Sequence, residues 1–307
     1  MRSSPSFYAF LTSLWLMLLL PLAQADTVAP LFDPAQLQLA SVSVAVAPLD
    51  SSELVYDKRA DWVMPIASIT KVMTALVVLE SGAPLDEWLQ VEERHFPAAA
   101  NAFSRIRIGS EARRGDLLRI ALMSSENYAA YLLARHHPEG YDAFIAAMND
   151  KAQALGMTQT QFVDSSGLSH ENVASAADLV KLVQAAYALP TLREYSTDGY
   201  HTVHFRKPGY SLNYGNTNPL VHSSRWQVDL TKTGYLTEAG RCLVMVVDVD
   251  GQPMAMALLN AFGTRTPLGD ASRIRRWLQT GEGGSVAQAA RRYEQEYVQQ
   301  RQSLALN

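Results

Sequence analysis

Residues 65–75 read PIASITKVMTA, and this stretch decides how the rest of the chain is interpreted. It opens an apolar run over residues 69–80 whose large side chains recur at helical spacing, which predicts a buried helix. Ser68 and Lys71 are three residues apart, so their side chains share one face of that helix. A serine hydroxyl needs a base to become a nucleophile, and a desolvated lysine can serve because burial lowers its pKa. The first backbone N–H groups of the helix can also hold an oxyanion beside Ser68.

A second short motif, SEN, occupies residues 125–127 on a helix expected over residues 115–135. Ser125 can pass a proton between the base and a leaving group, and Asn127 can hold both the lysine and the backbone of a substrate. Ser124 is the adjacent rival, but the spacing to the asparagine selects Ser125. A motif this short is weak by itself, because polar pairs are common on helices.

The third motif is Lys232-Thr233-Gly234, which follows an alternating apolar pattern and is expected to end a strand. Such a strand can lie antiparallel to an extended peptide. Lys232 and Thr233 can then meet a substrate carboxylate, and Gly234 lets the two backbones approach closely. Alone, the triplet would be interpreted as an ordinary turn.

Taken together, the three motifs carry far more weight. Ser68 precedes Ser125 by 57 residues, and Ser125 precedes Lys232 by 107. The order S-x-x-K, S-x-N, K-T-G matches the pattern of serine penicillin-recognising enzymes.

Over residues 40–280 the sequence resembles the D-alanyl-D-alanine carboxypeptidase/endopeptidase family of low-molecular-weight penicillin-binding proteins, and most closely its endopeptidase members. The resemblance is carried by PIASITKVMTA (65–75), ALMSSEN (121–127), FVDSSGL (162–168), SAADL (175–179), NTN (216–218), LTKTG (230–234) and AGRCLVM (239–245).

The resemblance implies a periplasmic hydrolase, without a cofactor, that cuts D-alanyl–diaminopimelate crosslinks in peptidoglycan and is inhibited covalently by β-lactams. Tyr128 stands where a basic residue is expected, beside the site. The family pattern assigns four residues: Ser68 as acyl-ester nucleophile, Lys71 as proton acceptor, Ser125 as the third active-site group, expected to relay a proton, and Lys232 as substrate binder. Thr233, Gly234 and Asn127 are expected from their motifs to bind substrate, and the backbone N–H groups of Ser68 and Tyr235 are expected to hold the oxyanion.

Three alternative functions remain open. The first is a D-alanyl-D-alanine carboxypeptidase, which the motifs cannot separate from an endopeptidase. The second is a class A β-lactamase, but Glu139, Glu171 and Glu194 all lack the asparagine four residues on that this class would show. The third is a β-lactam or muropeptide sensor without turnover, which should carry a signalling or membrane segment.

The order of elements predicts an α+β fold. Strands are expected over residues 42–46 and 54–56, helices over 69–80, 115–135, 141–155 and 175–188, strands again from about residue 200, and a closing helix over 270–279. Asp250-Gly251 between two apolar runs indicates a hairpin. The resemblance implies a β-lactamase/DD-peptidase-like antiparallel sheet flanked by helices, with a mainly helical subdomain.

Three parts are expected along the chain. Residues 1–25 have the form of a signal peptide, with an apolar run after Arg2 and a small-x-small site that predicts cleavage after Ala25. Residues 26–280 form the catalytic domain. Residues 281–307 are expected to be a flexible linker and a short solvated tail, with at most loose membrane association.

Composition excludes other classes. The 307 residues carry a net charge of −4, so a nucleic-acid partner is not expected. Cys242 is the single cysteine, lies in an apolar strand pattern and is interpreted as a core residue. No metal is expected, because the histidine pairs at 136–137 and at 201 and 204 lack a ligand arrangement. Asp164 and Asp178 are interpreted as groups that brace loops.

Overall fold

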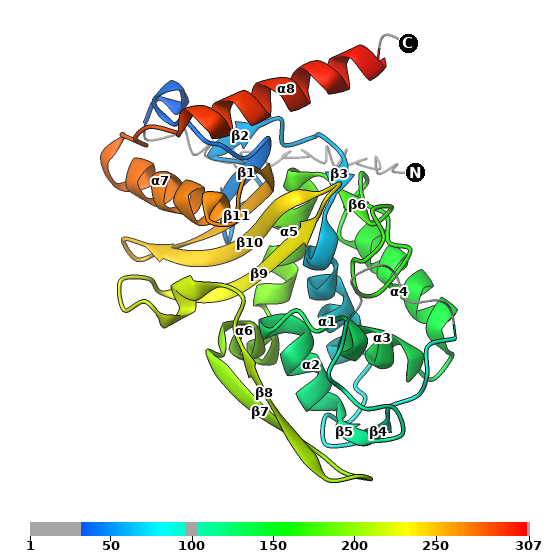
Figure 1. Ribbon diagram of the computed structural model, residues 1–307. Coiled ribbons are helices and arrows are strands. Elements are labelled where there is room, and N and C mark those ends of the chain that lie inside the picture. Colours follow the sequence, from blue (N-terminus) through cyan, green and yellow to red (C-terminus); the bar gives the residue numbers. More distant parts are fainter. Residues whose placement is uncertain (1–31, 96–102, 306–307) are drawn as a thin grey trace, which may run out of the picture.

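The computed structural model describes residues 32–95 and 103–305 (Figure 1). The predicted signal peptide and its cleavage site after Ala25 lie outside these residues. The described chain forms an α+β fold, as predicted, in which a five-stranded sheet packs beside a group of helices. No helix within the described ranges combines the length and the apolar character needed to cross a bilayer.

The main sheet is antiparallel throughout and is built from both ends of the domain. Its Asp250-Gly251 hairpin is confirmed, and both residues adopt positive φ as such a turn requires. The strands, in spatial order, are β2 (Tyr56–Lys58), β1 (Ser43–Pro48), β11 (Gln252–Ala261), β10 (Gly240–Val249) and β9 (Val228–Leu236).

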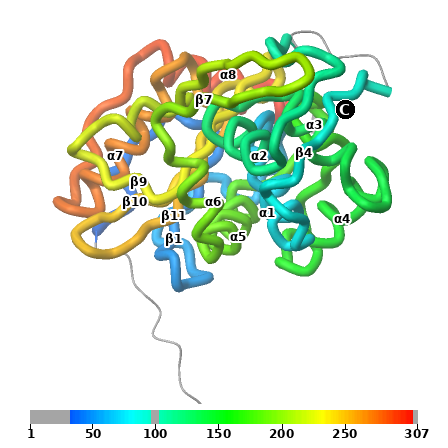
Figure 2. The backbone as a smooth tube through the Cα atoms, turned by 90° about the horizontal axis from the view of Figure 1, so that it is seen from below, coloured from blue at the N-terminus to red at the C-terminus, as the bar shows by residue number. Residues whose placement is uncertain are grey.

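Alternate residues of the central strands enter two different cores. In β10, Val244 and Val246 pack toward the helices, whereas Leu243 and Met245 pack toward α7 (Thr266–Thr280) and its buried Trp277. Figure 2 shows this division from below, with α7 on one side of the sheet and α1 to α4 on the other. The sheet is therefore buried on both faces, and β9 is left as the edge strand that faces the helical part.

The remaining elements form the helical part and its small ribbons. Helix α1 lies at its centre, and every residue from Thr70 to Val78 is buried. The helices are α1 (Thr70–Glu80), α2 (Arg114–Met123), α3 (Asn127–Arg135), α4 (Tyr141–Ala154), α5 (Ala176–Tyr187) and α6 (Pro190–Thr197), with 3-10 turns η1 (Pro34–Gln36), η2 (Ala67–Ile69) and η3 (Pro219–His222). The two-stranded ribbons pair β3 (Met64–Pro65) with β6 (Val173–Ala174), β4 (Trp88–Gln90) with β5 (Glu111–Arg113), and β7 (Tyr200–Phe205) with β8 (Tyr210–Gly215).

The single helix predicted over residues 115–135 is wrong, because the chain breaks between α2 and α3. Ser125 adopts a left-handed conformation with φ of 60°. The Glu126 side chain then accepts a hydrogen bond from the backbone N–H of Ala129 and so caps α3. Four consecutive polar residues, 124–127, interrupt the apolar pattern at this break, so the sequence did carry a local sign of it. Ser125 consequently lies on a turn between two helices and not on a helix.

The placement of Lys232-Thr233-Gly234 at the end of a strand also needs correction. Strand β9 continues to Leu236, and its pairing with β10 runs on through Gly234 and Tyr235. The triplet therefore lies inside the strand.

The segment 281–307 is predicted to be a flexible linker and a solvated tail, but its described part, residues 281–305, is held against the domain. Gly283 donates a backbone hydrogen bond to Gln36. Helix α8 (Gln288–Ala305) then lies across the sheet, and Glu294 forms ion pairs with Lys58, at 2.8 Å, and with Arg59. These partners lie more than two hundred residues away in the sequence, so local composition could not indicate them.

Candidate active site

Ser68 lies in η2, directly before α1, where two other chain segments press against the backbone. Ala67 adopts positive φ of 49°, a conformation that costs energy for a residue with a side chain. A Cβ on Gly167 would lie 2.0 Å from the Ala67 carbonyl oxygen, and one on Gly234 would lie 2.9 Å from the Ile66 carbonyl oxygen and 3.2 Å from the Ser68 nitrogen. Only glycine fits at both positions, so the serine backbone is fixed from two sides.

Lys71 is fully buried one turn further along α1, with 1% of its surface exposed. Its amine lies 2.9 Å from Ser68 Oγ and 2.7 Å from Asn127 Oδ1, and it also donates to the Ser166 carbonyl. Burial lowers the pKa of Lys71 from 10.5 to about 7, although the carboxylates of Asp164 and Glu126 oppose the shift. An amine of this kind is neutral in a large fraction of molecules near neutral pH and can accept a proton from the serine.

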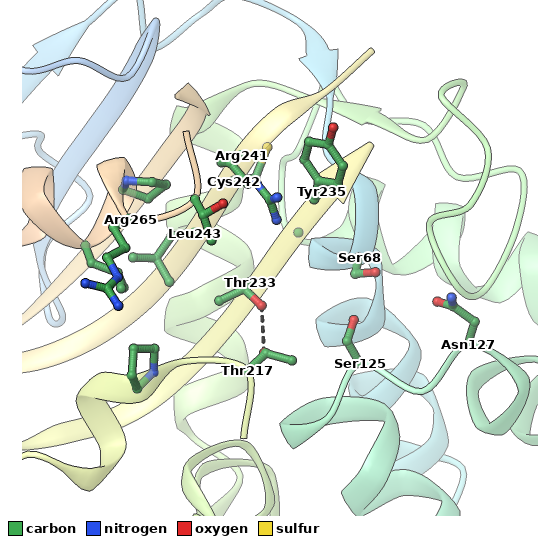
Figure 3. A pocket seen from close by; sticks show the side chains of 15 residues that line it. Ser68, Ser125, Asn127, Thr217, Thr233, Tyr235, Arg241, Cys242, Leu243 and Arg265 are labelled. Carbon is green, nitrogen blue, oxygen red and sulfur yellow. Dashed lines mark hydrogen bonds between the residues drawn. The ribbon is translucent and has the colours of Figure 1, made fainter. Parts of the chain in front are cut away.

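Ser125 and Asn127 reach the same point from the turn between α2 and α3. Figure 3 shows the side chains of Ser68, Ser125 and Asn127 converging. The left-handed turn at Ser125 aims its hydroxyl into the cavity, which Ser124 does not line. Of the two adjacent serines, Ser125 therefore lines the cavity and Ser124 does not.

Strand β9 supplies the opposite wall. Thr233 donates a hydrogen bond to Thr217 Oγ1 at 2.7 Å and lines the cavity with Gly234 and Tyr235 (Figure 3). The Lys232 side chain is buried, and its amine donates to the Thr233 carbonyl at 2.8 Å. Burial and the nearby Lys71 amine lower the pKa of Lys232 well below its ordinary value.

Ser68, Ser125, Asn127 and residues 233–235 line a cavity of about 410 Å³, whereas Lys71 and Lys232 are buried behind this lining. Its described lining includes the guanidinium groups of Arg241 and Arg265 but no carboxylate. The Arg241 guanidinium lies over the Tyr235 ring at 3.8 Å from its centre. The cavity is therefore suited to an anionic ligand.

The sequence reasoning missed several of these groups. Arg265 has no local pattern that connects it with the serine. Thr217 and Arg241 lie in the blocks NTN and AGRCLVM that carry the resemblance, but no role was predicted for them. The Ser166 carbonyl was missed as well, although its block, FVDSSGL, stood out. Asp164 in that block accepts backbone hydrogen bonds from residues 166, 167 and 169, which agrees with its interpretation as a loop brace.

Other singled-out residues have no part in this chemistry, although Cys242 contributes to the lining of the cavity (Figure 3). Tyr128 is buried, stacks on Tyr131 and donates to the Glu92 carbonyl, so its side chain does not line the cavity. Cys242 is buried, and burial raises the pKa of its thiol to about 12, as expected for a core residue. Within residues 32–95 and 103–305 no group of three or more potential metal ligands occurs. Asp178 accepts a hydrogen bond from the backbone N–H of Gln159 and so braces a loop.

The fold and the site together define a serine acyl-transfer enzyme of the penicillin-recognising class. The family model described as D-alanyl-D-alanine carboxypeptidase matches residues 31–263. The chain belongs to this family of serine DD-peptidases.

Two curated relatives cover most of the chain. A D-alanyl-D-alanine endopeptidase of Pseudomonas aeruginosa is 46% identical over 260 residues, which make up 85% of this chain and 84% of that protein. A D-alanyl-D-alanine endopeptidase of Escherichia coli K12 is 44% identical over 299 residues, 96% of each chain.

Solved structures agree with the fold. The Streptomyces K15 DD-transpeptidase superposes with a TM-score of 0.72 at 26% identity, covering 79% of this chain and 98% of that one. Penicillin-binding protein D2 from Listeria monocytogenes, in its ampicillin-bound form, gives 0.69 at 28% identity, covering 80% and 99%. The predicted β-lactamase/DD-peptidase-like architecture is thereby confirmed.

Proposed function

We propose that this chain is a penicillin-binding serine DD-endopeptidase that hydrolyses D-alanyl–diaminopimelate crosslinks in peptidoglycan. The observation that carries the proposal is the buried Lys71 amine, 2.9 Å from Ser68 Oγ at the edge of a cavity whose described lining holds two arginines and no carboxylate. The crosslink fits this cavity chemically, because the diaminopimelate beyond the scissile bond carries a free carboxylate. The names of the relatives that are 44% and 46% identical also support an endopeptidase.

In the acylation step Lys71 takes the proton from Ser68, whose Oγ attacks the D-alanyl carbonyl carbon. The backbone N–H groups of Ser68 and Tyr235 stabilise the oxyanion, each contributing about 10²–10³-fold. The C–N bond then breaks, and Ser125 passes a proton to the departing diaminopimelate amine. Each assisted proton transfer contributes about 10²–10⁴-fold.

Strand β9 and Asn127 bind the substrate. The substrate peptide lies alongside β9, where Gly234 permits close approach of the backbones. Thr233 lines the cavity and meets the carboxylate. The Lys232 amine is buried behind Thr233, and the negative charge of the substrate favours its ammonium form against the burial that lowers its pKa. Water then attacks the ester and releases the peptide from Ser68.

A D-alanyl-D-alanine carboxypeptidase is the second candidate, favoured by the description of the matching family. Its substrate offers the same carboxylate but a smaller leaving group, a single D-alanine. The shared chemistry means that only products can separate the two activities. A class A β-lactamase is disfavoured because the Glu-x-x-x-Asn segment is missing from the sequence.

The place of action that fits this substrate is the periplasm, reached by export and cleavage after Ala25. The first 25 residues support this location through their signal-like pattern. Peptidoglycan and β-lactams are then the expected partners.

The deciding experiment digests purified sacculi with the enzyme and with a Ser68→Ala control. An endopeptidase converts crosslinked dimers to monomers, whereas a carboxypeptidase releases free D-alanine and leaves dimers intact. Covalent labelling of Ser68 by penicillin without either product would indicate a sensor. Fast repeated turnover of nitrocefin would indicate a β-lactamase.

A further inference from the structure

Five cationic side chains gather beside the β7–β8 ribbon, which projects from the domain in Figure 1. We call this group the arginine ridge, and all five of its side chains are exposed: Arg105, Arg107, Arg113, Arg206 and Lys207. Segments 103–113 and 200–217 contain one acidic residue, Glu111, although the whole chain carries a net charge of −4. Positive charge is therefore concentrated on one edge of a negatively charged protein.

Aromatic rings hold the guanidinium groups of the ridge in place. A guanidinium that rests one face on a ring keeps its N–H edge available for a carboxylate, and its position is fixed in advance. The distances to ring centres are 5.0 Å for Arg105 over Tyr214, 4.6 Å for Arg107 over Tyr210, and 4.1 Å and 5.3 Å for Arg206 and Arg113 over Trp88.

The ridge carries more positive charge than its own carboxylate neutralises. Glu111 forms ion pairs with both Arg206 and Lys207, the latter at 2.9 Å. In the parts of the chain that the structure describes, Arg105, Arg107 and Arg113 form no ion pair with an acidic side chain. Like charges held this close repel each other, so an anionic partner would relieve the repulsion.

The ribbon beside the ridge ends next to the cavity, although no ridge residue lines the cavity itself. Thr217, two residues after β8 ends, lines the cavity and hydrogen-bonds Thr233. Arg105 donates to the Asn213 carbonyl at 2.7 Å, and Lys207 lies at the far end of the ribbon. At about 3.3 Å per residue, the ribbon extends roughly 30 Å from the cavity.

We propose that the arginine ridge binds carboxylates of peptidoglycan stem peptides that neighbour the crosslink in the cavity. The proposal rests on the proposed function, since a polymer cut in the cavity must continue beyond it. Stem peptides carry repeated free carboxylates, and a guanidinium edge accepts such a group through two parallel hydrogen bonds. The ridge would hold the enzyme on the intact wall without taking part in bond cleavage.

The test compares binding to insoluble sacculi with cleavage of a soluble crosslinked muropeptide dimer. The variant is Arg105→Gln with Arg107→Gln, and the matched control is Arg291→Gln with Arg292→Gln, which removes two exposed charges from α8. Binding is measured by co-sedimentation in a Ser68→Ala background, so that the wall stays intact. Sacculi whose carboxylates have been amidated serve as a second probe.

The ridge variant is expected to bind sacculi about tenfold more weakly at about 50 mM salt, with a smaller difference at high salt. Its cleavage of the soluble dimer should stay within twofold of wild type, and amidated sacculi should bind the variant and wild type alike. Arg113→Gln should show a smaller loss and gives an independent reading if the double variant does not fold.

Three outcomes would overturn the proposal. One is equal sacculus binding by the ridge variant and the α8 control. Another is an equal loss of soluble dimer cleavage, which would place the arginines in the cavity chemistry. The last is a loss of binding to phosphatidylglycerol vesicles with sacculus binding unchanged, which would assign the ridge to a membrane surface. If wild type binds sacculi but leaves the soluble dimer uncut, the proposed function is wrong. The ridge is then still tested separately, by comparing sacculus binding of the ridge variant and the α8 control.

Discussion

Replacing Lys71 with arginine should abolish its role as a base while keeping a cation in the site. With a pKa of about 7, about half of the Lys71 amines are neutral at pH 7. A lysine at the ordinary 10.5 would be neutral in roughly one molecule in 3000, and arginine stays protonated throughout. Acylation by a fluorescent penicillin should therefore fall about 10²–10⁴-fold in Lys71→Arg.

The acylation rate of the wild-type enzyme should also depend on pH in one direction. The neutral amine is the active form, so the acylation rate should rise about tenfold per pH unit below pH 7 and level off above it. The assay is stopped-flow labelling between about pH 5.5 and 9. Lys151→Arg, at the Glu80 ion pair on the surface, is the matched control and should leave the profile unchanged. A flat profile, or a Lys71→Arg rate within tenfold of wild type, would refute the reasoning.

Three further predictions concern other parts of the structure. Gly167→Ala should lower the free energy of unfolding by at least about 3 kcal/mol, because the new Cβ overlaps the backbone. Gly109 also has positive φ but faces open space, so Gly109→Ala should cost about 1 kcal/mol in the same thermal melts. Equal losses would mean that the close approach at Gly167 is unimportant. Glu294→Ala should lower the free energy of unfolding by about 1–3 kcal/mol in denaturant titrations, because Lys58 and Arg59 lose their ion-pair partner. Glu296 is exposed, so Glu296→Ala should lower it by less than about 0.5 kcal/mol. Identical midpoints would show that the Glu294 ion pairs on α8 add nothing to stability. Ser125→Ala should slow penicillin acylation about 10²–10⁴-fold, and a rate within threefold of wild type would remove Ser125 from the mechanism.

The sequence predicted the fold wherever a local pattern repeats a single physical rule. The buried helix after Ser68 follows from unbroken apolar spacing, and the hairpin at Asp250-Gly251 follows from turn chemistry. The helix prediction failed at Ser125, where the chain leaves helical geometry within a run of four polar residues, 124–127, that separates two apolar helices. It failed again at α8, whose binding to the sheet depends on partners such as Lys58 that lie far away along the chain.

Only the part of the site that depends on local geometry could be predicted from the sequence. Ser68 and Lys71 are one helical turn apart, so helix geometry alone brings them together. Arg265 reaches the cavity through the tertiary fold, and no spacing in the sequence indicates that it does. Thr217 lies in the NTN block, but the block alone does not show that its hydroxyl meets Thr233. The burial that lowers the pKa of Lys71 could be expected from the apolar helix, but the Ser166 carbonyl beneath its amine could not.

Because of the two glycine contacts at Ser68, the nucleophile is in place only when the chain has finished folding. Gly167 and Gly234 come from segments separated from Ser68 by about a third and about half of the chain, and both must arrive before the serine backbone is fixed. A partly folded molecule therefore has no assembled nucleophile and cannot attack the wall. Covalent capture of penicillin should accordingly report on finished folding, and damage at either distant glycine should lower it although the serine itself is intact.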